Sequence, residues 1–411
     1  MVIENPQILK KIQHVSFSKS GGAGAVAHRL QKFQSKSPDY ESAFLFDFHG
    51  SIGTDKFRDL SLTSSAIIDN KIIKKYNQKV LLSLFRNREN RQFFELIKSH
   101  SGITHLHWIN GIIDFNSLSK LVKLNKKLVW TIHDMEPFTG GCHYSLDCDQ
   151  LGKECIKCPI VYPPFRRNIR NQFQTKQAFY MNGNSIFYAF PSRWMQKQFN
   201  LAFPDVEIRS AIIANPISSI FFESNKDIEA FPTSSPNDLV VGFVSISLND
   251  PLKRFNLVLR ILNKVSEHIK KPITLVAIGM PIKINTVMPN IRIIQPGLIS
   301  DEKSLLGFYA SMDILISTSL SESFGLSIAE AGALGIPSLV QEGSGSSEII
   351  MDGLNGLVAK TESEFITKLI EFSTNSVLSE KLKKNIKTYA MENWHIEKVA
   401  SKYDAIYSEL A

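Results

Sequence analysis

Two glutamates and a glycine lie close together in the stretch from Ser317 to Ile336. Glu322 follows a strand-like run in a polar loop, and Glu330 comes eight residues later on an expected helix. Gly325 stands just before that helix, whose free backbone N–H groups and positive dipole end suit a phosphate. Two carboxylates would repel a diphosphate, but each can accept hydrogen bonds from the hydroxyl groups of a ribose or a hexose. The segment therefore predicts a site for a molecule that carries both phosphate and sugar hydroxyls.

Strands and helices alternate in both halves of the chain, as the spacing of apolar residues predicts. Strands are expected at residues 12–17, 42–46, 104–106, 127–132, 185–189, 239–245, 273–278, 291–294, 314–316 and 338–340. Helices are expected, among others, at residues 25–33, 72–85, 115–124, 254–269 and 394–410. This alternation predicts parallel sheets. Because it restarts after a loop-like stretch at 216–238, the 411 residues suit two α/β domains.

The composition is that of a globular enzyme, with 43% hydrophobic and 21% charged residues. No apolar run approaches the roughly 20 residues that a membrane span needs. The first residues also lack the apolar core of a signal peptide. These features predict a cytoplasmic protein.

The net charge of +8 is unevenly placed, because the first half is basic and the second half is mildly acidic. A basic half suggests an anionic partner, such as the inner membrane leaflet, a lipid diphosphate or nucleic acid. Ordinary solvated charge is the alternative interpretation.

Nearly the whole chain, and most densely the region from 297 to 358, resembles a large family of retaining GT-B glycosyltransferases, glycosyltransferase family 4 or glycosyl transferases group 1. Glu322-SFGLSIA-Glu330 matches its Glu-x7-Glu motif, and the flanking stretches match in order. The resemblance implies an α/β fold of two Rossmann-like, doubly wound domains that face a cleft. The N-terminal acceptor-binding domain would be 1–215, and the C-terminal nucleotide-sugar donor domain 216–392. Residues 393–411 would form a helix that returns to the N-terminal domain.

The resemblance assigns roles to the donor segment residue by residue. Glu330 would hold the ribose hydroxyls of the nucleotide, and Glu322 would contact the transferred sugar. The backbone amides of Phe324, Gly325 and Leu326 would bind the diphosphate. Divalent metal is not expected for catalysis, because the usual proposal for the family is front-face displacement, in which the departing phosphate oxygen takes the acceptor proton.

Four further positions resemble family features outside that segment. Gly297 and Leu298 would belong to the loop that reads the nucleotide base through backbone atoms. Asn215, before a proline, resembles the hinge residue near the diphosphate. Gly22, in the run Ser-Gly-Gly-Ala-Gly, resembles the N-terminal glycine loop that approaches the donor, although such a turn is often only structural.

Charged and aromatic groups would complete the site. Lys253 resembles the lysine that neutralises the leaving diphosphate. The chain departs from the family at the next position, where Arg254 replaces the usual glycine and is a candidate for a second positive charge. His133, at the end of an expected strand, would face the donor sugar. His105 and His107, in the run THLHWIN, are further candidates for lining the cleft.

All four cysteines of the chain, Cys142, Cys148, Cys155 and Cys158, lie within 17 residues. This density suggests a structural zinc site, in which His143 could replace one thiol. Reduced, unligated thiols are one alternative, and disulfides are a less favoured one because the cytoplasm is reducing.

The stretch around these cysteines also resembles bacterial exopolysaccharide glycosyltransferases of the colanic-acid kind. That subgroup implies a glycan or polyprenyl-diphosphate-linked acceptor at the inner face of the cytoplasmic membrane. A basic amphipathic segment would suit peripheral contact with anionic lipid, and so would Arg166, Arg167 and Arg170. The basic residues of that segment are Lys71, Lys74, Lys75, Lys79, Arg86, Arg88 and Arg91.

The sequence thus predicts a glycosyltransferase that takes its sugar from a UDP- or GDP-sugar. One alternative is a GT-B sugar-nucleotide epimerase, which would have a similar fold and no sugar acceptor. Another is a basic, zinc-containing nucleic-acid-binding protein. The phosphate turn and the carboxylate pair argue against this second alternative, and no nucleic-acid partner is expected.

Overall fold

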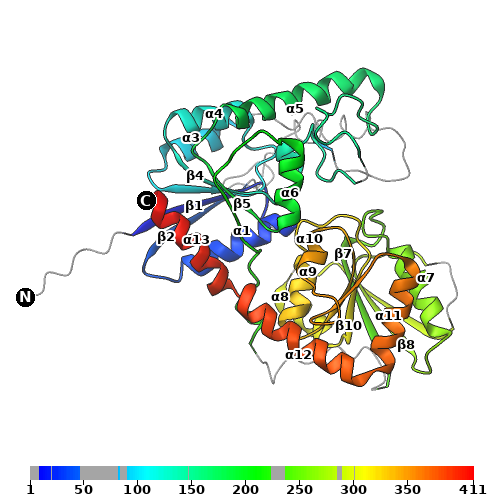
Figure 1. Cartoon of the computed structure of the whole chain (residues 1–411). Helices are drawn as coiled ribbons and strands as arrows, with labels where there is room; N and C mark the ends of the chain where they lie inside the picture. The colour runs from blue at the N-terminus through cyan, green and yellow to red at the C-terminus, as the bar shows by residue number, and fades with distance from the viewer. Residues whose placement is uncertain are drawn as a thin grey trace, which may run out of the picture. The chain divides into compact units, whose positions relative to one another are not determined.

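The computed structural model describes residues 9–19, 21–46, 82–83, 90–146, 148–223, 237–284, 289–299 and 301–411. The chain divides into two compact units (Figure 1). Unit 1 comprises Met1–Pro216 together with Val399–Ala411, and unit 2 comprises Ile217–Lys398. Each unit contains one six-stranded sheet, and all the strand pairs within these sheets are parallel.

The sheet of unit 1 has the strand order β2-β1-β3-β4-β5-β6. Its strands are β1 (Lys10–Ser16), β2 (Tyr40–Phe46), β3 (Ile103–Leu106), β4 (Lys127–Thr131), β5 (Phe187–Phe190) and β6 (Ser210–Ile212). The helices of this unit are α1 (Gly21–Gln34), α3 (Arg91–Ser99), α4 (Phe115–Lys123), α5 (Arg166–Met181), α6 (Arg193–Ala202), and the single 3-10 turns η1 (Glu136–Phe138) and η2 (Pro163–Phe165).

The sheet of unit 2 has the strand order β12-β11-β10-β7-β8-β9. Its strands are β7 (Leu239–Ser247), β8 (Ile273–Met280), β9 (Ile291–Gly297), β10 (Ile314–Ser317), β11 (Ser338–Gln341) and β12 (Leu357–Ala359). The helices after Pro216 are η3 (Ser219–Phe221), α7 (Phe255–Ser266), α8 (Glu302–Ala310), α9 (Leu326–Ala333), α10 (Gly345–Glu348), α11 (Glu362–Thr374), α12 (Ser376–Asn393) and α13 (Ile396–Leu410).

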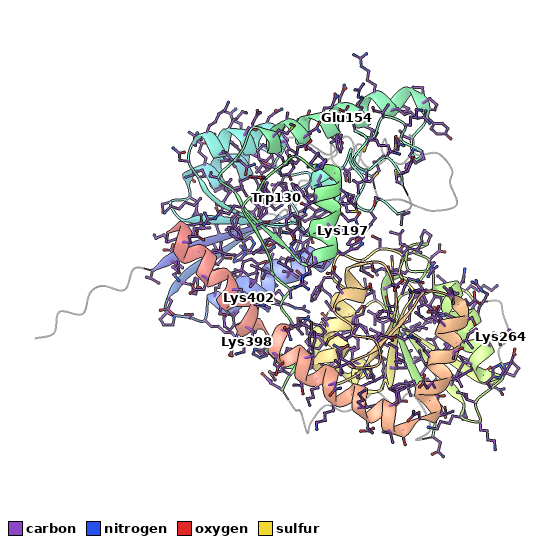
Figure 2. All side chains as sticks on the ribbon, viewed as in Figure 1. Trp130, Glu154, Lys197, Lys264, Lys398 and Lys402 are labelled. Atoms are coloured by element: carbon purple, nitrogen blue, oxygen red, sulfur yellow. The ribbon has the colours of Figure 1, made fainter. Side chains whose placement is uncertain are left out.

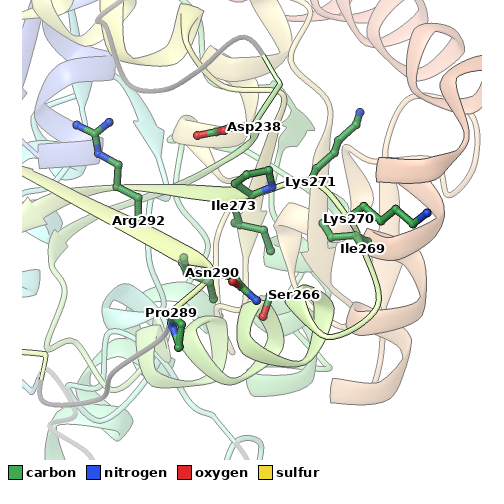
Figure 3. A pocket seen from close by; sticks show the side chains of 11 residues that line it. Asp238, Ser266, Ile269, Lys270, Lys271, Ile273, Pro289, Asn290 and Arg292 are labelled. Atoms are coloured by element: carbon green, nitrogen blue, oxygen red, sulfur yellow. The ribbon is translucent and has the colours of Figure 1, made fainter.

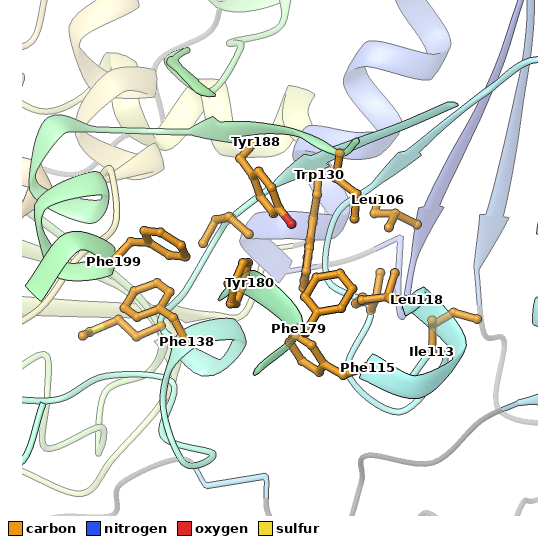
Figure 4. Packing of buried hydrophobic residues seen from close by; sticks show 14 of the residues in the cluster. Leu106, Ile113, Phe115, Leu118, Trp130, Phe138, Phe179, Tyr180, Tyr188 and Phe199 are labelled. Carbon is orange, nitrogen blue, oxygen red and sulfur yellow. The ribbon is translucent and has the colours of Figure 1, made fainter. Parts of the chain in front are cut away.

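The core of unit 1 is rich in aromatic side chains (Figure 4). Trp130 is fully buried on β4, and its indole N–H donates to the carbonyl of His107 at 3.1 Å. Tyr180 packs edge-on against Phe199, with ring centroids 5.0 Å apart. Such contacts contribute beyond the area that they bury. Trp130 is labelled among the side chains of this unit in Figure 2.

Helix α4 illustrates how the sequence positions these elements. Asp114 caps its first turn by accepting a hydrogen bond from the Ser117 amide at 2.7 Å. Phe115, Leu118 and Leu121 recur on one face, and all three are buried against the core.

Both sheets have a point at which the strand order changes direction. It lies between β1 and β3 in unit 1 and between β7 and β10 in unit 2. In open parallel sheets, ligands bind outside the carboxyl ends of the strands at this switch point. The loops after β1, β3, β7 and β10 are therefore the places to search for a site.

The structure confirms all ten strands that the sequence predicts, with ends that differ by no more than three residues. The sequence reasoning missed β6 and β12, which are only three residues long. The expected helix at 25–33 begins earlier, at Gly21, because the glycine run forms its first turn. Within that turn, a Cβ on Gly24 would lie 2.1 Å from the carbonyl oxygen of Ser18, so only glycine fits there.

The helix expected at 72–85 falls outside the described residues except at Leu82 and Ser83. There the prediction was wrong, because Leu82 forms an isolated antiparallel bridge with Cys142. The basic residues from Lys71 to Arg88 are likewise outside the described part of the chain, whereas Arg91 begins α3.

The C-terminal helix α13 packs within unit 1 from Val399 onward. The Tyr403 hydroxyl lies 2.9 Å from the Thr131 hydroxyl on β4, and Asp404 forms an ion pair with Lys10 on β1. These contacts join the last residues of the chain to the central strands of the first sheet.

Candidate active site

In unit 2, the loops after β7 and β10 meet through several hydrogen bonds. The Thr318 hydroxyl donates to the Lys253 carbonyl at 2.7 Å, and the Leu320 amide donates to the Leu252 carbonyl at 3.0 Å. Across this junction the Lys253 ammonium pairs with the Glu322 carboxylate. The two side chains keep 26% and 17% of their surface exposed, so a ligand can reach both. The structure thus brings together two predicted site residues that are 69 positions apart in the sequence.

Glu330 lies on α9 and is more deeply buried than Lys253 and Glu322. It is 7% exposed, and its Oε2 accepts a hydrogen bond from the Tyr309 hydroxyl at 3.1 Å. Helix α9 begins after Gly325, which has a φ of +97° that only glycine adopts without strain. Phe324 is buried and packs edge-on against Trp394. The glycine turn, the buried Phe324 and the helix start therefore hold the backbone amides in place for an anion.

Arg254 stands where the resembled family usually has glycine, and its contacts explain why the position tolerates an arginine. Its φ of +53° lies in the left-handed region, which disfavours a residue with a side chain by roughly 1–2 kcal/mol. Two hydrogen bonds hold it there: its Nε donates to the Thr318 carbonyl at 2.8 Å, and its Nη2 donates to Gln341. Burial lowers the pKa of the Arg254 guanidinium. This side chain therefore braces the two loops, and the half-buried Lys253 is the cation that pairs with Glu322 in the described part of the unit.

Sequence reasoning missed Gln341 and Gly345, which also shape these loops. The Gly345 amide donates to the Glu322 carbonyl at 2.8 Å, and a Cβ on Gly345 would lie 2.3 Å from the Ser323 carbonyl oxygen. The run Gly343–Gly345 after a strand was the signal in the sequence that could have identified this close backbone approach.

The remaining donor-site candidates occupy separate places. Gly297 ends β9 with a φ of +92°, and the Leu298 side chain is 57% exposed. Gly22 lies exposed in the first turn of α1 in unit 1. Asn215 is buried, and its Oδ1 has no hydrogen-bond partner among the described residues. A buried amide oxygen without a partner is costly, which makes Asn215 a good candidate for a ligand contact.

A hollow of about 420 Å³ opens at the opposite edge of the unit 2 sheet (Figure 3). Asp238, Ile273 and Ile291, at the amino-terminal ends of β7, β8 and β9, line it together with Lys270 and Lys271. Because it lies at the amino-terminal ends of the strands, it is distinct from the candidate site.

In unit 1, His133 follows β4 and is 9% exposed. Its Nε2 lies 3.0 Å from Nδ1 of His107. Burial lowers the pKa of His133 to about 4, a shift that neighbouring Asp134 only partly opposes. His105 and His107 are also buried, and burial lowers the pKa of each of them well below the usual value. At neutral pH these imidazoles are therefore uncharged.

Asp134 belongs to a second buried network beside His133. The His143 Nδ1 lies 2.7 Å from Asp134 Oδ2, and its Nε2 lies 2.8 Å from the Ser83 hydroxyl. A serine, a histidine and a carboxylate in this order resemble a hydrolase triad. Ser83, however, has no exposed surface, so no substrate can reach its hydroxyl. The network instead joins the segment at Ser83 to the loop that carries His143.

That loop is also anchored by a buried ion pair. Lys176 on α5 is fully buried, and its Nζ lies 2.6 Å from the Glu136 carboxylate. The same ammonium donates to the Glu136 carbonyl oxygen and lies 5.5 Å from the centre of the Phe115 ring. The segment after His133 is thus held from two sides.

The four cysteines lie near one another in the same loop region, and none forms a disulfide. Cys142, Cys155 and Cys158 are buried. Burial, followed by the neighbouring thiols, raises the pKa of Cys142 well above its usual value. Among the described residues, however, only His14, His105 and His107 form a group of three or more ligand atoms within 4.8 Å of one another. The thiols therefore do not converge on one point as zinc ligands would.

Two of the arginines expected to face a membrane are engaged with the protein. Arg170 pairs with Glu154 at 3.0 Å, and Arg166 donates to the Cys158 carbonyl at 3.1 Å. Among the helices that the structure describes, none is both long enough and apolar enough to cross a membrane.

Comparison with known proteins supports this interpretation of the fold. Two α/β units, each built on a six-stranded parallel sheet, form the architecture of the GT-B class of fold. Residues 229–389 match the family model of glycosyl transferases group 1.

Curated relatives are distant. The chain is 22% identical over 286 residues to the putative colanic acid biosynthesis glycosyl transferase WcaC of Escherichia coli, a match that covers 67% of this chain. It is 28% identical over 108 residues, or 26% of this chain, to an uncharacterized 41.2 kDa protein in the cps region of Klebsiella pneumoniae. The matched segments span 66% and 30% of those two proteins' own lengths.

Solved structures share the fold over nearly the whole chain. HepE of Anabaena, solved with UDP and glucose, has a TM-score of 0.64 at 14% identity, covering 97% of this chain and 100% of that one. Sucrose-phosphate synthase of Thermosynechococcus elongatus has a TM-score of 0.67 at 12% identity, covering 98% of this chain and 99% of that one. At such identities the likeness establishes the GT-B fold alone.

Proposed function

We propose that the protein is a retaining glycosyltransferase of the hexosyltransferase type. It moves a sugar from a UDP- or GDP-sugar to a glycan or lipid-linked oligosaccharide acceptor in bacterial surface polysaccharide biosynthesis. The observation that carries this proposal is the Lys253–Glu322 ion pair at the switch point of unit 2, with Glu330 on the adjoining helix. The family match and the exopolysaccharide relative support it.

The donor binds in unit 2, the donor domain, where different residues recognise its ribose, its sugar, its diphosphate and its base. Glu330 accepts hydrogen bonds from the ribose hydroxyls, and Glu322 accepts them from the transferred sugar. The amides at Phe324, Gly325 and Leu326 bind the diphosphate. The base lies against the backbone of Gly297 and Leu298.

Lys253 gives the reaction its electrostatic stabilisation. Its ammonium is paired with Glu322 before the donor binds, and negative charge grows on the diphosphate as the glycosidic bond breaks. A cation already in place stabilises that charge without reorganising. Arg254 supports it by holding the loop, and catalysis takes place without a catalytic metal.

Unit 1 forms the acceptor domain, and its contribution centres on His133, which faces the transferred sugar. Gly22 and Asn215 approach the donor from this part of the chain. The acceptor is a glycan or polyprenyl-diphosphate-linked sugar at the inner face of the cytoplasmic membrane. The basic N-terminal half of the chain favours peripheral contact with anionic lipid there.

We keep a structural zinc ion as the proposal for Cys142, Cys148, Cys155 and Cys158. Bringing thiolates together in a buried place is unfavourable, as the raised pKa of Cys142 reflects, and Zn²⁺ would remove that penalty. Binding would require the loop to draw the four sulfur atoms closer. Metal analysis of the purified protein, with a Cys155→Ser/Cys158→Ser variant as control, decides between zinc and free thiols.

Ligand-induced thermal shift with a panel of nucleoside diphosphates tests the donor site. A diphosphate at ten times its dissociation constant should stabilise the protein by about 1.4 kcal/mol. Glu330→Ala should abolish this stabilisation. Glu380→Ala, which removes a carboxylate that is 75% exposed in the same unit, should leave it intact. Absence of a shift with any nucleotide, in a folded wild-type sample, would contradict the proposed site.

Product analysis separates transfer from the epimerase alternative and tests retention. Incubation with a nucleotide-sugar and an acceptor should release nucleoside diphosphate and give a product with the anomeric configuration of the donor. An epimerase would convert the nucleotide-sugar without an acceptor. Inversion at the anomeric carbon would contradict the retaining assignment.

A further inference from the structure

A line of buried imidazoles runs through unit 1 to His133. Oε1 of Gln34 on α1 lies 2.8 Å from Nε2 of His14 on β1. Nδ1 of His14 lies 3.1 Å from Nε2 of His107, which follows β3. Nδ1 of His107 lies 3.0 Å from Nε2 of His133, which follows β4. One continuous hydrogen-bonded chain therefore joins Gln34 to the predicted sugar-binding histidine.

The strand order explains how residues so distant in sequence come together. β1 and β3 are neighbours, and His14 is in register with His105. β3 and β4 are neighbours in turn, so the residues after their carboxyl ends, His107 and His133, lie side by side with ring centroids 5.3 Å apart. The row of hydrogen bonds from Gln34 to His133 thus runs along the carboxyl ends of the strands, beside the switch point between β1 and β3.

Each imidazole in this chain is uncharged, so each carries one N–H and one lone pair. Burial lowers the pKa of His14 to about 4, although the hydrogen bond to Gln34 opposes this shift. Burial likewise lowers the pKa of His107 and His133. Two neutral rings can share a hydrogen bond only if one donates and the other accepts, so the tautomer of one ring determines that of the next.

Gln34 determines which partner donates in each hydrogen bond from His14 to His133. Its carbonyl oxygen can only accept, and it faces both His14 and the Ser42 hydroxyl, which donates to it at 3.1 Å. His14 must then carry its proton on Nε2 and accept at Nδ1. By the same rule His107 donates from Nε2 to His14 and accepts at Nδ1 from Nε2 of His133.

We propose that Gln34, His14 and His107 are positioning residues that lock His133 in its Nε2–H tautomer, so that its Nδ1 is a permanent hydrogen-bond acceptor. In the proposed transferase, on which this consequence rests, His133 then accepts a bond from a hydroxyl group of the sugar. Toward the ligand His133 neither donates a bond nor carries a positive charge, so its Nδ1 selects for a ligand hydroxyl and against an acceptor-only group at that position.

The same cluster invites a different interpretation, namely a metal site formed by His14, His105 and His107. Their ligand atoms lie within 4.8 Å of one another. All six ring nitrogens already have hydrogen-bond partners, however. Those of His105 face the hydroxyls of Tyr407 and Thr131, both at 2.7 Å. No lone pair remains free for a metal without breaking a bond within the protein, so the hydrogen-bonded chain is favoured.

Nitrogen-15 NMR of the histidine side chains reads each tautomer directly and needs no enzymatic activity. In the ¹⁵N-histidine-labelled wild type, His14, His107 and His133 should all be neutral Nε2–H tautomers near neutral pH. The His133 signals are assigned by their loss in His133→Asn. An Nδ1–H tautomer or a charged ring at His133 would overturn the proposal, as would displacement of these signals by stoichiometric Zn²⁺.

Variants test whether the distant amide controls His133. Gln34→Met should give mixed tautomers at His133, whereas Gln34→Glu, which keeps an acceptor oxygen, should restore the Nε2–H form. Tyr403→Phe is the matched control. It removes a buried hydroxyl that bonds to Thr131 and takes no part in the row of hydrogen bonds from Gln34 to His133. A His133 tautomer that is the same in Gln34→Met as in the wild type would refute the coupling.

Kinetics add a second readout. Gln34→Met should lower kcat/KM for the nucleotide-sugar by about 2- to 10-fold, the range expected for weakening one neutral hydrogen bond, and Gln34→Glu should recover most of it. If Gln34→Met has the same activity as the wild type, the tautomer of His133 plays no role in substrate recognition. If no transfer is detected with any donor but the tautomers are as expected, the proposed function fails while the locked chain stands.

Discussion

The buried ion pair between Lys176 and Glu136 allows a prediction with a defined magnitude. Lys176 has no exposed surface, Glu136 is 7% exposed at its side chain, and the charged atoms are 2.6 Å apart. In Lys176→Met the Glu136 carboxylate would remain buried without its partner. Breaking a buried pair from one side typically costs about 3–5 kcal/mol. For a unit of this size each kcal/mol lowers the melting temperature by about 2–4 °C, so we expect a decrease of about 6–20 °C.

The assay is thermal unfolding followed by circular dichroism, and two further variants make it specific. Lys153→Met breaks an exposed pair with Asp149, whose side chains are 63% and 72% exposed, and should change the melting temperature by less than about 2 °C. The double variant Lys176→Met/Glu136→Leu replaces both charges with apolar groups and should recover most of the loss.

The result that refutes this reasoning is specific. If Lys176→Met unfolds within about 2 °C of the wild type, the pair is solvated and does not anchor the loop after His133. If the double variant is as unstable as Lys176→Met, the loss comes from packing of the lysine stem and not from an unpaired carboxylate.

Three other perturbations follow from the site. Arg254→Gly should relieve the positive φ but lose the brace to Thr318, so it should leave stability within about 1 kcal/mol in chemical denaturation while weakening nucleotide binding. Tyr309→Phe removes the hydroxyl bonded to Glu330 and should raise the Kd for the nucleoside diphosphate about 2- to 10-fold in calorimetry. Ser373→Ala, which removes a hydroxyl that donates to the Ile370 carbonyl within α11, should leave the Kd unchanged. Stability should be fully present above pH 6.5 and be lost as the pH falls toward 4. The reason is that His14 and His133 have folded pKa values of about 4, below the usual 6.5, so the unfolded chain binds protons first. Denaturant midpoints across this range that do not fall would contradict it, and His133→Asn should lessen the fall.

Local signals in the sequence were sufficient for much of the fold and for the donor segment. The strands β7 to β11 are runs of apolar, often β-branched residues bounded by polar turns, and such runs report burial directly. Short strands such as β6 and β12 escape this reasoning, because three residues carry no periodicity. The start of α1 was misplaced because glycines usually indicate a turn, whereas here Gly24 is required by the close approach of Ser18.

Other features of the site have no local signal. Nothing near His14 in the sequence indicates that it bonds to His107, 93 positions away, or that Gln34 completes the chain. The partnership of Lys176 with Glu136 is equally invisible, because a single lysine on a helix usually lies in solvent.

The sequence by itself determined the local chemistry of this protein: the carboxylates eight residues apart, the glycine turn before a helix, and the alternation of strands and helices. Spacing suffices for these because their parts lie within one or two turns of chain. Only the tertiary structure decided which side chains are partners and which are charged. The order of strands in a parallel sheet brings distant residues to one edge, and burial there turns histidines neutral and makes each hydrogen bond depend on the next.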